Sequence, residues 1–190
     1  MGQAVTAAAC AAGHKVTVIS GPVALTYHEA ARVIDVTTTE EMLEAASLEF
    51  PRHDGLIGVA APCDYRPREA ATSKITKTGE PLVMELVETP DIVATLAEAK
   101  RPGQWVVGFA LETEDAHFRA LSKMEHKECD LMALNGPAAI GKETTFLDLF
   151  ARGAGHVGKL QGSKREVAAE LIKLIEKRLI ETRVRDGHSP

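Results

Sequence analysis

The chain has few of the residues that mark specialised protein classes. Aromatic residues make up only 4% of its 190 residues, there are three widely spaced cysteines, and the formal net charge is -5 at pH 7. The lack of excess positive charge argues against a protein that neutralises many nucleic-acid phosphates. An odd number of scattered cysteines argues against a disulfide framework and favours a reducing compartment. We therefore expect a cytoplasmic protein with no nucleic-acid partner.

Long hydrophobic runs and metal-ligand patterns are also lacking. No apolar stretch approaches the roughly 20 residues that a membrane helix needs, and the seven histidines show no paired ligand spacing. We expect neither a membrane span nor a bound structural metal. The length and the 45% hydrophobic content suit a single domain with a substantial core. We place this domain at residues 1–185 and expect residues 186–190 to form a frayed tail.

Apolar strands alternate with amphipathic helices along the chain, which is typical of a doubly wound, mostly parallel sheet. We therefore predict an α/β fold with three Rossmann-like layers, five or six strands and a long flap after the central strand. Strands are predicted at residues 15–20, 32–36, 54–61, 105–111 and 131–134, with residues 144–150 as a late antiparallel addition. Helices are predicted at residues 3–12, 38–50, 91–100 and 164–182.

Capping signals indicate where three helices begin. Ser or Thr followed three residues later by Glu forms a capping box, and such pairs occur at residues 38 and 41 and at residues 163 and 166. Thr89 before Pro90 predicts an N-cap with proline at the first helical position. In the helix that follows Thr38, the spacing of apolar residues predicts a buried side that includes Leu48.

The most informative segment is residues 58–77, GVAAPCDYRPREAATSKITK, where an apolar run ends in a polar stretch rich in groups that bind anions. The carboxyl ends of parallel strands are where α/β proteins hold ligands. Residues 62–85 contain three prolines and are too long for an ordinary crossover turn. Long irregular segments of this kind are commonly lids or binding loops.

Five blocks of the chain together resemble a known family. They are AGHKVTVISGPV at residues 12–23, the Ala60-Ala61 pair with Asp64-Tyr65-Arg66, KITK at residues 74–77, ELVETPDI at residues 85–92 and VGFALET at residues 107–113. A sixth block, SKREVA, opens the last predicted helix at Ser163. In this order the blocks resemble the phosphopantothenoylcysteine synthetase domain of the bifunctional bacterial flavoprotein that makes coenzyme A precursors.

The resemblance implies a ligase. In the family, the carboxylate of 4'-phosphopantothenate attacks the α-phosphate of CTP, with Mg2+, and cysteine then attacks the resulting acyl-cytidylate. It also implies a homodimer, and no flavin is expected in this chain. By similarity, the catalytic positions are Lys74, Ala60 and Ala61, the nucleotide-binding positions are Asp64, Phe109, Asn135 and Lys164, and the flap carries Arg66 and Lys77.

The chain departs from the family pattern at three places. The family has a glycine- and serine-rich phosphate-binding segment before the Met-Gly pair that aligns with Met1 and Gly2, so we expect that segment and the decarboxylase domain to be absent here. Gly136 replaces an aspartate after Asn135, and Thr76 replaces a lysine. An alternative hypothesis is therefore a catalytically impaired, truncated homologue that acts only as a nucleotide-binding or dimerising module.

Three other interpretations rest on short motifs. Residues 136–143, GPAAIGKE, nearly match the phosphate-binding loop of NTPases, but Glu143 stands where a hydroxyl is needed and a strand-like segment follows. A dinucleotide-binding protein is disfavoured because Ser20-Gly21-Pro22 replaces the glycine fingerprint after the first strand. Cys63 has no histidine nearby in sequence, so we interpret it as a packing residue rather than a nucleophile.

Overall fold

The structure is a computed structural model, and it describes residues 1–112, 115–136 and 142–181. Its central sheet has five strands in the order β3-β6-β7-β8-β9. The parallel part consists of β3 (Gly55–Gly58), β6 (Trp105–Leu111) and β7 (Leu131–Asn135). The antiparallel part consists of β8 (Thr144–Ala151) and β9 (Gly155–Ser163). The predicted antiparallel addition at residues 144–150 is thereby confirmed.

A second, two-stranded ladder pairs β1 (Thr17–Ser20) and β2 (Arg32–Asp35) in parallel. We predicted that the strand now labelled β3 is central. This was wrong, because β1 does not pair with β3, and β3 is therefore at one end of the five-stranded order. Its residues are accordingly half-buried rather than fully buried.

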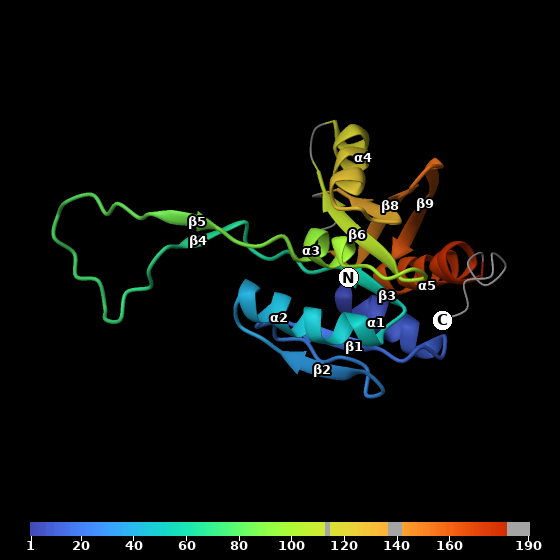
Figure 1. The fold of residues 1–190 in the computed structure, drawn as a ribbon, viewed down its shortest axis with the longest axis horizontal. Helices are drawn as coiled ribbons and strands as arrows, with labels where there is room; N and C mark the ends of the chain where they lie inside the picture. The colour runs from blue at the N-terminus through green and yellow to red at the C-terminus, as the bar shows by residue number, and fades with distance from the viewer. Residues whose placement is uncertain (113–114, 137–141, 182–190) are drawn as a thin grey trace.

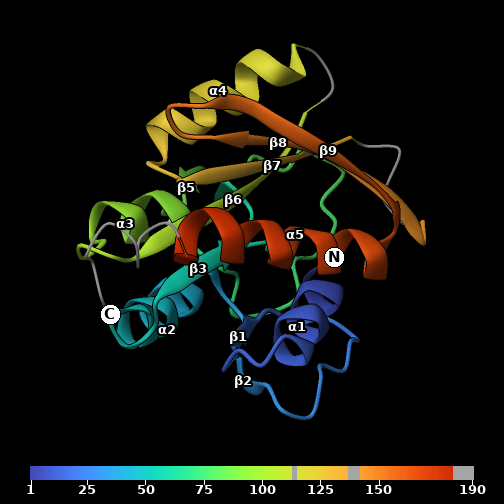
Figure 2. The same ribbon diagram turned by 90° about the vertical axis from the view of Figure 1, so that its right-hand side faces the viewer.

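Helices cover both faces of the sheet and make the three layers (Figures 1 and 2). On one face lie α1 (Gly2–Ala11) and α5 (Lys164–Ile175), which continues as a π-helical stretch over Glu176–Ile180. On the other face lie α2 (Thr39–Glu49), α3 (Ile92–Glu98) and α4 (Ala116–His126). A 3-10 turn, η1 (Phe50–Arg52), follows α2. The predicted α/β class is confirmed.

The period-two alternation of β6 divides the core into two clusters. Val107 is fully buried against α1 and α5, whereas its neighbour Val106 is fully buried against α3 and α4. A side chain would not fit at Gly108, because a Cβ there would lie 2.9 Å from Cys129 Sγ. The layers therefore fit closely at β6, the strand that carries one of the predicted site residues.

The predicted helix starts are partly confirmed. Thr38 and Ser163 both form complete capping boxes with the glutamate three residues later. The predicted N-cap of α3 was wrong, because the side chain of Asp91, and not that of Thr89, accepts the hydrogen bond from Ala94 N. Thr89 instead donates its hydroxyl proton to the carbonyl of Cys63. The prediction that Leu48 is buried was also wrong, since this residue is 63% exposed. The end of the last helix at residue 182 and the frayed tail lie outside the described residues.

The capping box of α5 leads to a prediction about pH. The backbone N–H of Ser163 and its hydroxyl both donate to the Glu166 carboxylate, at 2.9 and 2.8 Å, and they lower the pKa of this carboxyl. A folded-state pKa below the unfolded value stabilises the protein above the unfolded pKa, and this contribution disappears as pH falls through the folded pKa. We expect Glu166→Gln to lower the free energy of unfolding at pH 7, and the difference from wild type to shrink from about pH 4.3 downward.

Urea unfolding of both proteins between pH 7 and pH 3 measures this difference. Glu125→Gln is the matched control, because Glu125 is also an exposed helical glutamate. A difference between wild type and Glu166→Gln that stayed constant over the whole pH range would contradict the assignment.

Residues 62–89 form a long arm that projects from the body of the molecule (Figure 1). At its base, β4 (Tyr65–Pro67) pairs with β5 (Leu86–Glu88) as an antiparallel ribbon. The segment between these two strands has no helix or strand, and its side chains are exposed. The long irregular segment predicted from the sequence is confirmed, and the structure gives it a two-stranded base.

Candidate functional site

One edge of the sheet collects most of the residues that the sequence singled out. The parallel strands β3, β6 and β7 end there, and so does β9, because Ser163 pairs with Thr144 at the start of β8. The arm also leaves the body at this edge, directly after β3. We call it the carboxyl edge. In open α/β sheets, ligands bind in crevices at such edges.

The backbone after β3 is open to an approaching ligand. Ala60 and Ala61 follow the last residue of the strand, and both are exposed. Asp64 is also exposed at the root of the arm, where its carbonyl accepts a 3.0 Å hydrogen bond from Thr89 N. These three predicted site residues therefore lie on one short segment at the carboxyl edge, and the bond to Thr89 fixes the end of this segment.

Phe109 and Asn135 lie near the ends of neighbouring strands. Phe109 is half-buried in β6 and packs with the cluster beneath α1 and α5. Asn135 closes β7, pairs in register with Leu111, and its Oδ1 accepts a 3.3 Å hydrogen bond from the hydroxyl of Thr145. The Asn135 side chain is therefore held in place by a buried hydroxyl that the sequence did not single out.

Lys164 lies at the same edge, on the first residue of α5. Its side chain is half-buried, and its positive charge helps to lower the pKa of the Met1 amine, for which burial is the larger cause. Two N–H groups of this helix start already have partners, since Lys164 N donates to Glu143 O and Glu166 N donates to Ser163 Oγ. The lysine side chain therefore supplies positive charge at a helix start where two N–H groups are already engaged.

The flap residues are separated from the rest of the predicted site. Lys74 and Lys77 lie on the exposed part of the arm, which extends away from the body (Figure 1). Arg66 lies in β4 at the base and donates from Nε to Glu40 Oε1 of α2 at 2.5 Å. The structure therefore does not bring Lys74 together with Ala60 and Phe109, and contact between them requires the arm to move.

A buried carboxylate at the carboxyl edge was missed by the sequence analysis. The Glu112 side chain is only 7% exposed, directly after β6, and forms ion pairs with Lys123 at 2.5 Å and Arg119 at 3.8 Å on α4. Its backbone N–H donates to Asn135 O at 3.5 Å. The signal in the sequence was an acidic residue at the end of an apolar strand, within the VGFALET block. Glu112 ties α4 to the end of β6.

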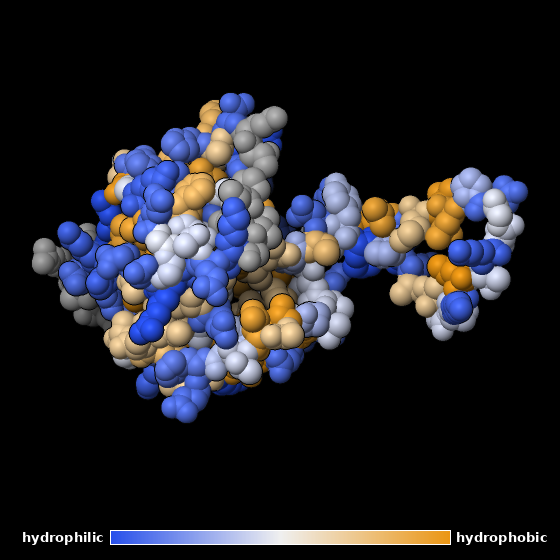
Figure 3. Space-filling view, turned by 180° about the vertical axis from the view of Figure 1, so that it is seen from behind, coloured by the Kyte–Doolittle hydropathy of each residue, from blue (hydrophilic) through white to orange (hydrophobic). Residues whose placement is uncertain are grey.

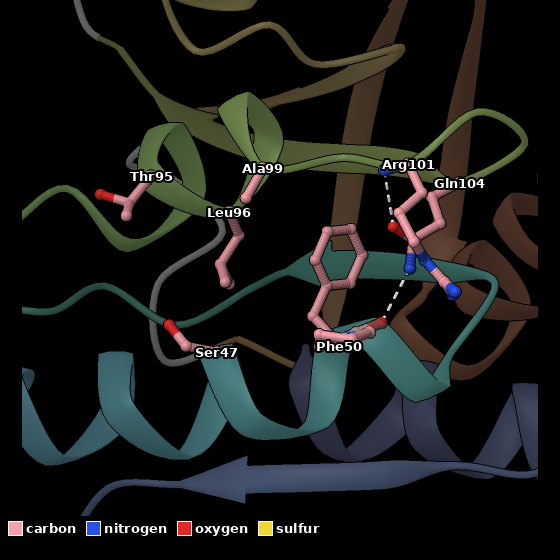
Figure 4. Close-up of a pocket in the computed structure, with 8 residues that line it drawn as sticks. Ser47, Phe50, Thr95, Leu96, Ala99, Arg101 and Gln104 are labelled. Atoms are coloured by element: carbon pink, nitrogen blue, oxygen red, sulfur yellow. Dashed lines mark hydrogen bonds between the residues drawn. The ribbon is translucent and has the colours of Figure 1, made fainter.

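A small hollow lies elsewhere, between α2, η1 and α3 (Figure 4). It holds about 130 Å3 and contains Phe50, Leu96 and Gln104 in its lining. Gln104 directly precedes β6 and donates to Phe50 O at 2.8 Å, so the hollow lies at the end of β6 opposite to the carboxyl edge. It includes none of the residues predicted to bind substrate.

Several other expectations concern absences within the described ranges. No group of three or more His, Cys, Asp or Glu is placed there to hold a metal ion. None of the described helices is both long and apolar enough to cross a membrane. Part of the near match to a phosphate-binding loop, residues 137–141, lies outside the described residues. The element that follows it is strand β8 and not the helix that such a loop requires, which is evidence against an NTPase of that class.

The fold and the edge together define a Rossmann-like α/β domain with its candidate site at the carboxyl ends of parallel strands. Residues 1–179 match the family described as DNA/pantothenate metabolism flavoprotein C-terminal domain. The chain belongs to this family, and the resemblance drawn from the sequence is confirmed.

Individual relatives agree with this assignment. The coenzyme A biosynthesis bifunctional protein CoaBC of Haemophilus influenzae is 34% identical over 96% of this chain and 46% of its own length. The crystal structure of the C-terminal domain of a CoaBC protein has a TM-score of 0.77 at 28% identity, covering 94% of this chain and 81% of that one. The chain thus spans about half the length of the curated relative.

A more distant structure shares only the fold. A Cab2 variant in complex with phosphopantothenate-cysteine has a TM-score of 0.66 at 15% identity. The match covers 85% of this chain and 56% of the Cab2 chain.

Proposed function

We propose that this domain joins 4'-phosphopantothenate to cysteine through an acyl-cytidylate formed from CTP, as a step of coenzyme A biosynthesis. Membership of the family and the likeness to CoaBC support the pathway. The observation that carries the proposal is that the predicted residues after β3 and those of β6, β7 and α5 converge on one edge of the sheet.

The reaction requires positioning rather than a protein nucleophile. A carboxylate oxygen of phosphopantothenate attacks the α-phosphorus of CTP, and pyrophosphate leaves with the electrons of the broken P–O bond. The amine of cysteine then attacks the acyl carbon, loses a proton and releases CMP. The small side chains of Ala60 and Ala61 allow the acyl group to approach the backbone, and Lys164 supplies positive charge for the phosphates.

Mg2+ fits this site as a companion of CTP. It typically keeps several waters and is held by one or two carboxylates together with substrate phosphates, so it does not need a dedicated protein cage. Asp64 is the exposed carboxylate on the segment after β3 and would contact such an ion. When bound, Mg2+ neutralises charge on the phosphates.

Lys74 completes the proposed site only when the arm folds over the carboxyl edge. Its ammonium then lies against the negative charge that develops at the α-phosphate and on the acyl-cytidylate. Because the lysine is exposed on the extended arm, its ammonium is hydrated there, and it gives up this water only when the arm closes on the ligand.

We also propose that two copies pair through the arm. The arm exposes several large apolar side chains among hydrophilic ones (Figure 3), and a monomer gains nothing from leaving them in water. They are Tyr65 at 54%, Ile75 at 59%, Leu82 at 64%, Val83 at 90%, Met84 at 55% and Leu86 at 53% exposure.

We further propose a cytoplasmic location. The three free cysteines, of which Cys129 is buried, agree with it.

The proposal is tested by the products of the purified chain. With 4'-phosphopantothenate, CTP and Mg2+ we expect release of pyrophosphate, and with cysteine added we expect continued turnover that forms CMP. Omitting phosphopantothenate is the control, because an enzyme that simply hydrolyses CTP to CMP would release pyrophosphate without it. If CTP binds but no pyrophosphate appears, the domain acts as a nucleotide-binding or dimerising module instead.

A further inference from the structure

One charged contact joins the arm to the body. Arg66 Nε, in β4, donates to Glu40 Oε1 at 2.5 Å, and the same guanidinium donates to Pro67 O at 3.2 Å. Glu40 lies in the first turn of α2, whose start is fixed by the capping box of Thr38 and Glu41. The acceptor of this contact therefore stands on a fixed part of the body, and the donor stands on the base of the arm.

The base of the arm holds together as a unit. Tyr65 donates its hydroxyl proton to Glu88 at 3.2 Å, and Arg68 pairs with Glu85 at 2.7 Å across the ribbon. These contacts lie within the arm. Among the described residues, the bond from Arg66 to Glu40 is the one hydrogen bond or ion pair recorded between the arm and the body. A change at that contact is transmitted to the whole ribbon.

We propose that Glu40 is a positioning residue, whose ion pair with Arg66 sets the resting orientation of the arm against α2. The orientation of the arm decides how often Lys74 reaches the carboxyl edge, and this second part of the inference rests on the proposed function. The first part concerns only the arm and the body, so it can be measured without substrate.

The strength of the contact suits an arm that must be released. The side chains of Glu40 and Arg66 are 44% and 47% exposed. An exposed pair of this kind shifts a population by only about 1.4- to 5-fold, so it favours one orientation without locking it. The hydrogen bond from Arg66 is the main cause that lowers the pKa of the Glu40 carboxyl, so the pair persists further into the acid range than an unpaired glutamate would remain ionised.

The experiment measures the distance between the arm and the body of one chain by pulsed dipolar spectroscopy, with the labelled protein diluted in an excess of unlabelled protein so that two labelled copies rarely pair. Spin labels are attached at Thr78→Cys on the arm and Phe118→Cys on α4, both exposed positions, after Cys10 and Cys63 are replaced by serine. Cys129 remains because it is buried. The labelled protein without substrate is compared with the same protein carrying Glu40→Lys.

We expect Glu40→Lys to lower the ratio of the major to the minor distance population by more than the 5-fold limit of simple removal, because it also places two positive charges together. Glu44→Lys is the matched control, since Glu44 is an exposed glutamate one turn further along α2 and has no recorded ion pair within the described residues. It is expected to leave the distribution unchanged. The charge swap Glu40→Lys with Arg66→Glu is expected to restore the wild-type distribution.

Salt provides a second measurement that a general folding defect would not imitate. At 1 M salt the Debye length falls to about 3 Å, so the wild-type distribution is expected to broaden, while that of Glu40→Gln is expected to stay the same. Equal distributions for wild type, Glu40→Lys and Glu44→Lys would overturn the proposal, and so would a charge swap that fails to restore the distance. A ligase assay that fails while the distances respond as expected would count against the proposed function alone.

Discussion

Replacing Lys74 with alanine is expected to lower the rate of pyrophosphate release by about 100- to 1000-fold, the usual loss when one donor to a developing negative charge is removed. The reason is that the arm delivers this ammonium to the activated acyl-nucleotide. Since Lys74 is exposed on the extended arm, its removal leaves the packing of the body unchanged. We expect the effect in kcat, with the unfolding midpoint unaltered.

Lys142→Ala is the matched comparison for this experiment. Lys142 is also an exposed lysine, and it is the residue that a phosphate-binding loop would use. The ligase interpretation predicts a small loss for Lys142→Ala and a large one for Lys74→Ala. The reverse order, measured as pyrophosphate release and CTP affinity, would contradict a central role of the arm in the reaction.

Replacing Leu171 with alanine is expected to lower the free energy of unfolding by about 2–5 kcal/mol, as for other fully buried leucines. Leu171 is 0% exposed and belongs to the cluster between the sheet and the helix pair α1 and α5. Leu48→Ala makes the same chemical change at a helical position that is 63% exposed, and its expected cost is within about 0.5 kcal/mol.

Urea unfolding measures both variants, and equal slopes would show that they share one denatured state. Similar losses for Leu171→Ala and Leu48→Ala would contradict the packing described for α5. They would also indicate that the side chain of Leu48 is covered, as its sequence spacing had suggested.

Much of the fold could be predicted because its signals are local. The capping boxes at Thr38 and Ser163 depend on side chains three residues apart, and the apolar run of β6 needs no knowledge of its neighbours. β9 was missed because its sequence, GHVGKLQGS, has three glycines and little alternation, and its extended form depends on pairing with β8. Thr89 was assigned as a cap because the sequence does not show that the root of the arm uses its hydroxyl.

The candidate site shows the same division. Positions after strand ends, such as Ala60 and Asn135, could be predicted to share an edge because parallel strands finish together. The separation of Lys74 from that edge could not be predicted, since no local rule sets the direction of a long ribbon. The pairing of Glu112 with Lys123 was likewise hidden, because it depends on how α4 packs against the end of β6.

The packing of α1 against α5 has a consequence for the order of folding. These helices lie near opposite ends of the chain, so Val5 and Ala9 reach their apolar partners only after residue 175 has left the ribosome. The β8–β9 hairpin needs only nearby residues and can form first. During synthesis, the apolar face of α1 therefore stays uncovered until α5 has formed, and exposed apolar surface of this kind favours aggregation.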